Sequence, residues 1–170
     1  MLTLALAFAL TFSGSPQAAP ATIAPTAAVP TRGVLAPGKS LGGIELGDTS
    51  AEVKRRWGAR YALCGVCKRA TWMYTYRTGR LSGVAVSFRN GRVIAIFTLG
   101  APNGWRTPQG LTLGDPTRVA MDLYTEMGWS RCIGYGALTM RRPGVVTSIY
   151  TFGESVYGFA LTRPSEPVCQ

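Results

Sequence analysis

The stretch Gly43–Gly58, GIELGDTSAEVKRRWG, decides the predicted fold, because most of it returns at Gly110–Gly128 as GLTLGDPTRVAMDLYTEMG. From Gly43 to Trp57 the two copies keep one constant offset, so that the Gly-Asp pair at 47–48 aligns with the pair at 114–115, and the final glycine of the second copy comes three residues later. An internal repeat of this kind indicates two copies of one structural unit. The sequence therefore predicts two similar halves.

Each copy predicts a short apolar strand, a turn at Gly-Asp and a capped helix. In the second copy, Asp115 directly before Pro116 is typical of an N-cap followed by the first helical residue. In the first copy two N-caps compete: Asp48 at the matching position, and Thr49 in a capping box with Glu52. A glycine can end a helix in the left-handed conformation. The glycines that end the two predicted helices are Gly58 and Gly128.

Strand patterns follow each helix. Asn90-Gly91 lies between two β-rich runs, 84–88 and 93–97, and this is the strongest short signal for a hairpin. The other predicted strands are 71–76, 137–142, 145–152 and 155–161. We therefore expect an α+β fold of two tandem helix-plus-antiparallel-sheet repeats, with the helices packed on one face of a curved sheet.

The ends of the chain differ in composition from the middle. Residues 1–21 contain a short apolar run and a small-residue cleavage site, which predict a secretory signal peptide; an uncleaved hydrophobic anchor is the alternative. Residues 22–38 are rich in Ala, Pro and Thr and predict an extended linker. The folded domain is expected at 39–170, with repeats at 41–100 and 108–165. An exported protein without a transmembrane span in its mature form follows from this organisation.

Four cysteines in an exported chain predict two disulfides. We favour Cys64–Cys67 and Cys132–Cys169 among the three possible pairings. The alternative for Cys64-x-x-Cys67 is a redox-active pair of a thiol-disulfide oxidoreductase. Because redox motifs usually stand at the start of a helix, where the thiolate is stabilised, the position of this motif after a helix favours a structural role.

The chain is basic, with 18 Lys and Arg against 8 Asp and Glu, and it has no His. The scattered positive charge is typical of a solvated surface, but it also suits an anionic cell-envelope component. The lack of His removes Ser-His-Asp and Cys-His catalysis and the commonest metal ligand. We predict no enzyme activity, metal or cofactor, and no nucleic-acid partner.

Aromatic side chains supply the predicted binding face. Residues of one strand alternate between the two faces of a sheet, so some aromatic residues should remain uncovered if the helices cover one face. Any single one of them could instead belong to the core. The candidate binding residues are Trp72, Tyr74, Tyr76, Tyr150, Phe152, Tyr157, Phe159, Arg89 and Arg92.

The first copy resembles the repeat shared by the SmpA/OmlA outer-membrane assembly lipoproteins and the β-lactamase inhibitor protein family, Ile-x-x-Gly-Met-Thr-x-x-x-Val-x-x-x-x-Gly. The residues that match are Ile44, Gly47, Thr49, Val53 and Gly58, with Asp48 in place of Met. The resemblance implies two tandem repeats that bind proteins through an open sheet face without catalysis. Together these features predict an exported binding module for a protein or an anionic envelope component.

Overall fold

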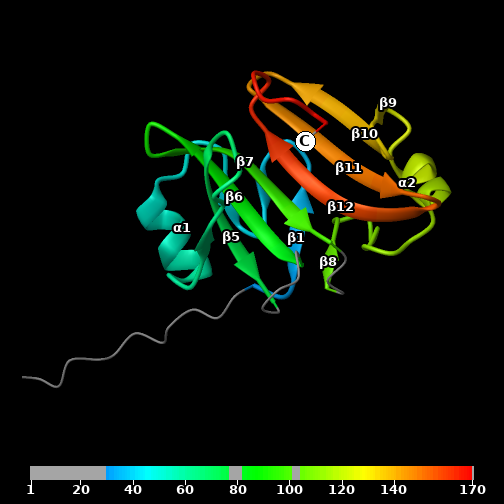
Figure 1. Cartoon of the computed structure of the whole chain (residues 1–170). Helices are drawn as coiled ribbons and strands as arrows, with labels where there is room; N and C mark the ends of the chain where they lie inside the picture. Colours follow the sequence, from blue (N-terminus) through cyan, green and yellow to red (C-terminus); the bar gives the residue numbers. More distant parts are fainter. Residues whose placement is uncertain (1–29, 77–81, 101–103, 170) are drawn as a thin grey trace, which may run out of the picture.

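The computed structural model describes residues 30–76, 82–100 and 104–169, and these residues form mainly β-strands in two sheets (Figure 1). The large sheet has the strand order β4-β5-β6-β7-β12-β11-β10-β9, and the small sheet has the order β3-β2-β1-β8. The strands of the large sheet are β4 (Ala62–Leu63), β5 (Ala70–Thr75), β6 (Gly83–Arg89), β7 (Arg92–Leu99), β9 (Gly128–Cys132), β10 (Tyr135–Arg142), β11 (Val145–Phe152) and β12 (Ser155–Thr162). Those of the small sheet are β1 (Gly33–Ala36), β2 (Ser40–Leu41), β3 (Ile44–Glu45) and β8 (Trp105–Arg106), and the helices are α1 (Ser50–Trp57) and α2 (Thr117–Leu123).

The α+β prediction is wrong, because the described chain is mostly β. The helices α1 and α2 have only 8 and 7 residues, and α2 buries Ala120 alone. Much of the covering layer comes instead from the small sheet, which contributes four fully buried side chains to the main core. These side chains are Leu35, Leu41, Ile44 and Trp105.

The small sheet also corrects the predicted linker. Residues 22–29 of that segment lie outside the described residues, as does the predicted signal peptide at 1–21. Within the described part, however, residues 33–36 form β1, which pairs with β2 and β8. Since Leu35 is fully buried there, the fold begins before the expected boundary at residue 39. The Ala- and Pro-rich composition around Leu35 therefore does not prevent this segment from forming a strand with a buried side chain.

The large sheet has two different faces. Its core face packs against the small sheet and the helices, and strand pairs such as Val86–Ile96 place their side chains there. Neighbouring residues point to the opposite face because side chains alternate along a strand. That opposite face is crossed by the C-terminal segment 163–169, so we call it the tail face. Its small second core contains Cys132, Ala137, Tyr150 and Ala160.

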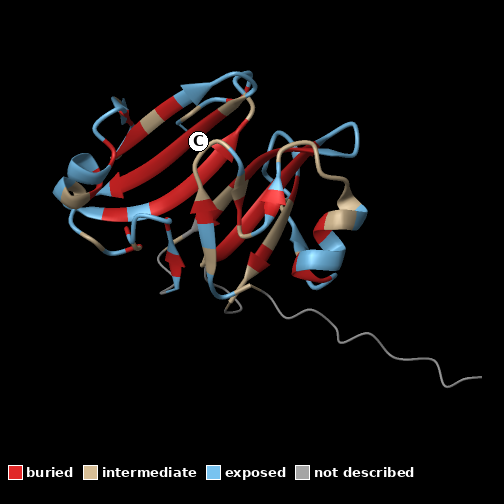
Figure 2. Cartoon of the chain, turned by 180° about the vertical axis from the view of Figure 1, so that it is seen from behind, coloured by how far each residue is buried: buried red, intermediate tan, exposed pale blue. Residues whose placement is uncertain are grey.

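The predicted hairpin at Asn90-Gly91 is confirmed. The strands β6 and β7 pair from Gly83–Leu99 to Arg89–Arg92. Asn90 has φ 51° and Gly91 has φ 71°, the left-handed conformations that a two-residue type I′ turn requires. This short turn fixes the register of the two central strands, which are buried along most of their length (Figure 2).

The two Gly-Asp turns make the same hydrogen bonds. The carboxylate of Asp48 accepts from the amide of Glu45 at 2.9 Å, and the carboxylate of Asp115 accepts from the amide of Thr112 at 2.7 Å. Each turn also exchanges two backbone hydrogen bonds with a strand. The glycine amide (Gly47 or Gly114) donates to the carbonyl of Val93 or Val156, whose own amide donates to the carbonyl of Asp48 or Asp115. The two aspartates therefore close the turn before each helix and do not cap it.

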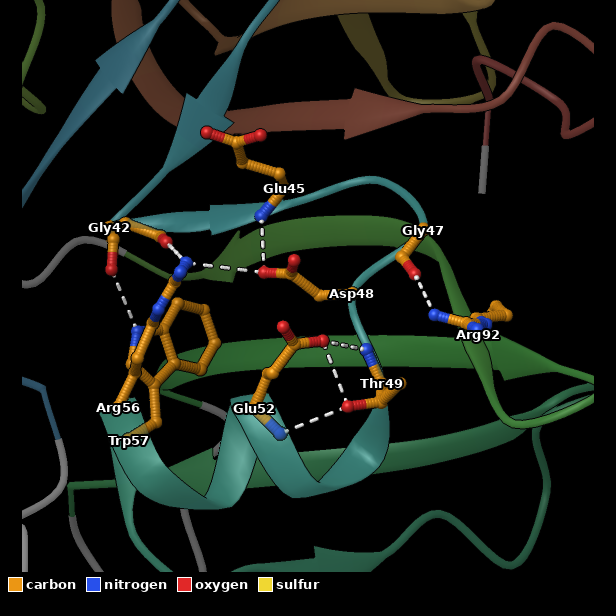
Figure 3. A network of polar contacts seen from close by, with 10 residues as sticks. Gly42, Glu45, Gly47, Asp48, Thr49, Glu52, Arg56, Trp57 and Arg92 are labelled. Carbon is orange, nitrogen blue, oxygen red and sulfur yellow. Dashed lines mark hydrogen bonds and ion pairs between the residues drawn. The ribbon is translucent and has the colours of Figure 1, made fainter.

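The helix ends differ from the prediction in the second half. In α1 the capping box of Thr49 and Glu52 forms, and Gly58 is the C-cap (Figure 3). The N-cap of α2 is Pro116, which supplies no side-chain hydrogen bond. The helix α2 ends at Leu123, and Gly128 begins β9. Asp115 as N-cap and Gly128 as helix end are therefore both wrong.

Candidate binding surfaces

The predicted aromatic face of β5 is part of the core. Tyr74 is fully buried, and its ring lies edge-on to Trp57 of α1 with centroids 5.5 Å apart. Trp72 stacks on Tyr61 at 3.9 Å. The hydroxyl of Tyr76, just beyond β5, donates to the carbonyl of Pro30 at 2.6 Å. These three aromatic residues hold α1 and the N-terminal segment to the sheet and leave little surface for a partner.

The aromatic residues of β11 and β12 separate between the two faces. The register shifts between Tyr150 and Thr151, which breaks the expected alternation along this hairpin. Phe159 is fully buried in the main core, whereas Tyr150 packs in the second core on the tail face. Burial, and less strongly the neighbouring Tyr135, raise the pKa of Tyr150, whose hydroxyl donates to the carbonyl of Val168 at 2.8 Å. Tyr157 and Phe159 therefore do not share one face, contrary to the sequence pattern.

Only two of the predicted aromatic residues are well exposed. Phe152 is 64% exposed and Tyr157 is 44% exposed, and their ring centroids lie 6.1 Å apart. They stand near the turn between β11 and β12, beside the turn between β9 and β10. Two further large apolar residues at this end were not predicted from the sequence: Trp129 of β9, which is 52% exposed, and Ile133 of the turn, which is 100% exposed. No sequence signal marks Trp129, because only the strand order of the folded sheet places β9 at an edge.

We call Trp129, Ile133, Phe152 and Tyr157 the end patch. A shallow hollow of about 320 Å³ lies beside Trp129; its lining includes Trp129, Gly134 and Gly153, whereas Ile133, Phe152 and Tyr157 are not part of it. Gly136 makes room for the indole of Trp129, because a Cβ at Gly136 would lie 2.3 Å from the ring. Arg131 also lines the hollow. The end patch thus combines exposed aromatic residues with an arginine.

The predicted arginines have structural partners. Arg89 forms an ion pair with the buried carboxylate of Glu166, which Arg69 also contacts at 3.4 Å. Arg92 donates to the carbonyl of Gly47 at 3.2 Å (Figure 3). Both predicted arginines lie in the first half of the sheet, away from the end patch in the β9–β12 half. Arg92 instead stabilises the turn at Gly47, and Arg89 stabilises the C-terminal segment through Glu166.

Both predicted disulfides form. Cys64 and Cys67 close a loop between β4 and β5, and Cys132 and Cys169 tie the tail to the end of β9. No helix begins at Cys64 or Cys67 in the described part of the chain, so no helix terminus stabilises a thiolate there. Disulfides of this kind are typical of proteins from oxidising compartments.

The described ranges hold neither a cluster of metal-binding side chains nor a helix that could cross a membrane. Residues 30–76, 82–100 and 104–169 contain no group of three or more His, Cys, Asp or Glu placed to hold a metal ion. Among the same residues, neither helix has the length and apolar character of a membrane span.

Comparisons with known proteins identify no family. No protein-family model and no curated protein matches the sequence. Among solved structures, the chain is similar to a 1.5 Å crystal structure of an extracellular protein containing a SCP domain from Bacillus anthracis str. Ames, with 11% identity and a TM-score of 0.49. The match covers 70% of this chain and 44% of that chain. A likeness this low carries no argument about function, and the resemblance to the SmpA/OmlA and β-lactamase inhibitor families stays a prediction.

Proposed function

We propose that the chain is an exported, disulfide-stabilised binding module that holds a protein partner at the end patch. The observation that carries the proposal is the exposure of Trp129, Ile133, Phe152 and Tyr157 at one end of the strands β9 to β12, with Arg131 beside Trp129 in a shallow hollow. Large apolar side chains that gather on a surface mark interaction sites, and Trp, Tyr and Arg are enriched among the residues that dominate binding.

The rigid support of the end patch favours this function. The strands β9 and β10 pair from Cys132–Tyr135 to Gly128–Thr139, and the disulfide Cys132–Cys169 fixes the end of β9. A partner that binds a preformed surface loses less conformational freedom than one that must order a loop. The aromatic anchors are thus held in place before the partner arrives.

The positive charge of the protein supports a competing proposal, in which the partner is an anionic envelope component. Of the described cations, only Arg56, Arg69 and Arg89 form ion pairs. The remaining cations attract anionic polymers without specific contacts, and such attraction weakens when salt screens it. Salt dependence therefore separates the two kinds of partner.

The test is a pull-down from culture fluid and cell envelope at low and high salt, with the wild-type protein and a Phe152→Ser/Tyr157→Ser variant. We expect one discrete protein that the wild type retains at high salt and the variant loses. The matched control is Leu63→Ser/Val66→Ser, which removes two exposed apolar side chains near the other disulfide and should retain the protein.

Three results would contradict the end patch. Equal retention by the Phe152→Ser/Tyr157→Ser variant would place the partner elsewhere. Capture only at low salt, of mixed acidic material, would make the net charge of +10 the functional feature. Reduction of insulin by the wild type, lost in Cys64→Ala, would favour the thiol-disulfide enzyme instead.

A further inference from the structure

A cleft of about 640 Å³ lies on the tail face, between the C-terminal segment and the strands β5, β6 and β7. It belongs to the opposite half of the sheet from the end patch. Its lining residues come from the loop after Cys64, the three strands and the tail: Cys67, Lys68, Arg69, Thr71, Ser87, Phe97, Glu166, Pro167 and Cys169. A volume of this size is typical of small-molecule sites.

The floor of the cleft suits an apolar chain. The exposed lining is mostly apolar, with Phe97 on β7 and sulfur from both disulfides. Thr71 Oγ1 donates to the carbonyl of Arg69 at 3.1 Å, so the contact of 2.8 Å with Ser87 requires Ser87 Oγ to donate to Thr71 Oγ1. Both buried hydroxyl protons then have acceptors. An alkyl chain lying over this pair leaves no donor without a partner.

The rim of the cleft suits an anion. Among the described residues that line the cleft, Glu166 alone carries a carboxylate, which is buried and already contacts Arg69 and Arg89. Arg69 uses its Nε in that contact and keeps further N–H groups, because a guanidinium carries five donors. Lys68 adds an exposed ammonium that no carboxylate of the described residues pairs with. Positive charge therefore exceeds negative charge around the opening.

The wall formed by the tail is held at both ends. Glu166 contacts Arg69 and Arg89 in the first half of the sheet, and the Val168 carbonyl accepts from Tyr150 in the second half. The disulfide Cys132–Cys169 closes the end of the segment. The cleft is thus preformed, which lowers the entropy lost on binding.

We propose that this cleft binds a small amphipathic carboxylate free in solution. Its alkyl or aromatic body lies on Phe97 and the Thr71–Ser87 pair, and its carboxylate lies between Lys68 and Arg69 at the opening. The site is independent of the end patch and of the protein partner proposed there.

The test uses octanoate and 1-octanol, which share a chain length and differ in charge, titrated into the full exported protein labelled with ¹⁵N. We expect saturable shifts of the amides of Thr71, Ser87, Phe97 and Glu166 at millimolar octanoate or below. Binding of 1-octanol should be at least about tenfold weaker, since it cannot pair with the cations.

Two charge reversals localise the carboxylate. Lys68→Glu should weaken octanoate binding about fivefold, the size expected for an exposed charge pair. Lys39→Glu makes the same change at an exposed lysine outside the cleft and should leave binding unchanged. Both are surface variants, so folding is kept. Absence of shifts in the cleft, equal binding of 1-octanol, or equal effects of the two variants would overturn the proposal.

Discussion

The helices α1 and α2 follow the same Gly-Asp turn but are stabilised differently. The helix α1 has a capping box, buries Val53 and Trp57, and is tied by Arg56 to Asp48 and to the carbonyl of Gly43 (Figure 3). The helix α2 has no side-chain cap and exposes Met121 and Leu123. The turn is thus the shared element, and the helix after it is where the halves differ. The second half also exposes most of the large apolar residues that lie at the surface.

The largest expected effect is that of Trp57→Ala. This buried indole contacts Tyr74 and Trp105 and donates to the carbonyl of Gly42 at 2.9 Å. Its removal leaves a cavity and should lower the free energy of unfolding by about 3–5 kcal/mol in urea denaturation. The control in α2, Leu123→Ala, should cost under about 0.5 kcal/mol because this side chain is exposed. Equal losses would show that both helices contribute alike.

Removal of the disulfide should instead destabilise the second half more than the first. The bond Cys132–Cys169 spans a sequence separation of 37, and Cys64–Cys67 spans 3. Because closing a longer loop removes more entropy from the unfolded chain, Cys132→Ala/Cys169→Ala should cost about 4 kcal/mol and Cys64→Ala/Cys67→Ala about 2 kcal/mol. Thermal unfolding of the two double variants measures this order. A reversed order would mean that the loop at Cys64 organises the first half.

Alkaline pH should affect both halves alike. Burial raises the pKa of Tyr74 in the first half and of Tyr150 in the second. The folded state therefore keeps these phenols protonated while the unfolded chain ionises near pH 10. Their stabilisation is complete below that pH and decreases above it, by about 1.4 kcal/mol per pH unit for each tyrosine. Urea denaturation between pH 9 and 11 should show this slope, and Tyr74→Phe should reduce it; an unchanged slope would contradict the assignment.

The capping box should contribute a smaller amount. Thr49 Oγ1 accepts from the amide of Glu52 at 3.2 Å, and the Glu52 carboxylate accepts from the Thr49 amide at 2.7 Å. The bond from the Thr49 amide, and next the bond that Thr49 Oγ1 donates to the same carboxylate at 2.8 Å, lower the pKa of Glu52. Thr49→Ala should cost about 1 kcal/mol at neutral pH. At acidic pH, where the protonated Glu52 no longer supports the cap, the difference from wild type should shrink. A constant difference would mean that the carboxylate plays no part.

The smallest expected effect is a gain in stability. Pro116 occupies the N-cap of α2 with φ −57° and ψ 138°, a conformation that serine also adopts. Pro116→Ser would supply the missing side-chain acceptor and should stabilise the protein by up to about 1 kcal/mol, less the cost of a more flexible unfolded chain. Differential scanning calorimetry against wild type measures the shift. A loss of stability would indicate that the proline itself fixes the entry to α2.

Local signals in the sequence predicted individual turns and helix ends, but not the fold class and little of the candidate site. The Asn90-Gly91 hairpin and the helix end at Gly58 depend on a few adjacent residues and were predicted, and Thr49 was one of the two N-caps predicted for the first helix. Exposure of Phe152 and burial of Phe159 were not readable, because a register shift at Tyr150–Thr151 changes which residues share a face. The exposure of Trp129 and Ile133 could not be predicted either, because their surroundings come from other strands.

The sequence by itself predicted the Gly-Asp turns and the hairpins at Asn90-Gly91 and Gly153-Glu154, since short-range geometry decides these features, and it favoured the two disulfide pairs among three possible pairings. Only the tertiary structure decided which layer covers the core face. A segment whose composition is typical of a linker supplies β1 and the buried Leu35, because pairing with β2 and β8 satisfies its backbone and the main core accepts its side chain. The cleft under the tail likewise exists only when Glu166 meets Arg69 and Arg89 across the sheet, 97 and 77 positions away along the chain. Long-range contacts of this kind leave no periodic pattern, so no local pattern could have predicted them.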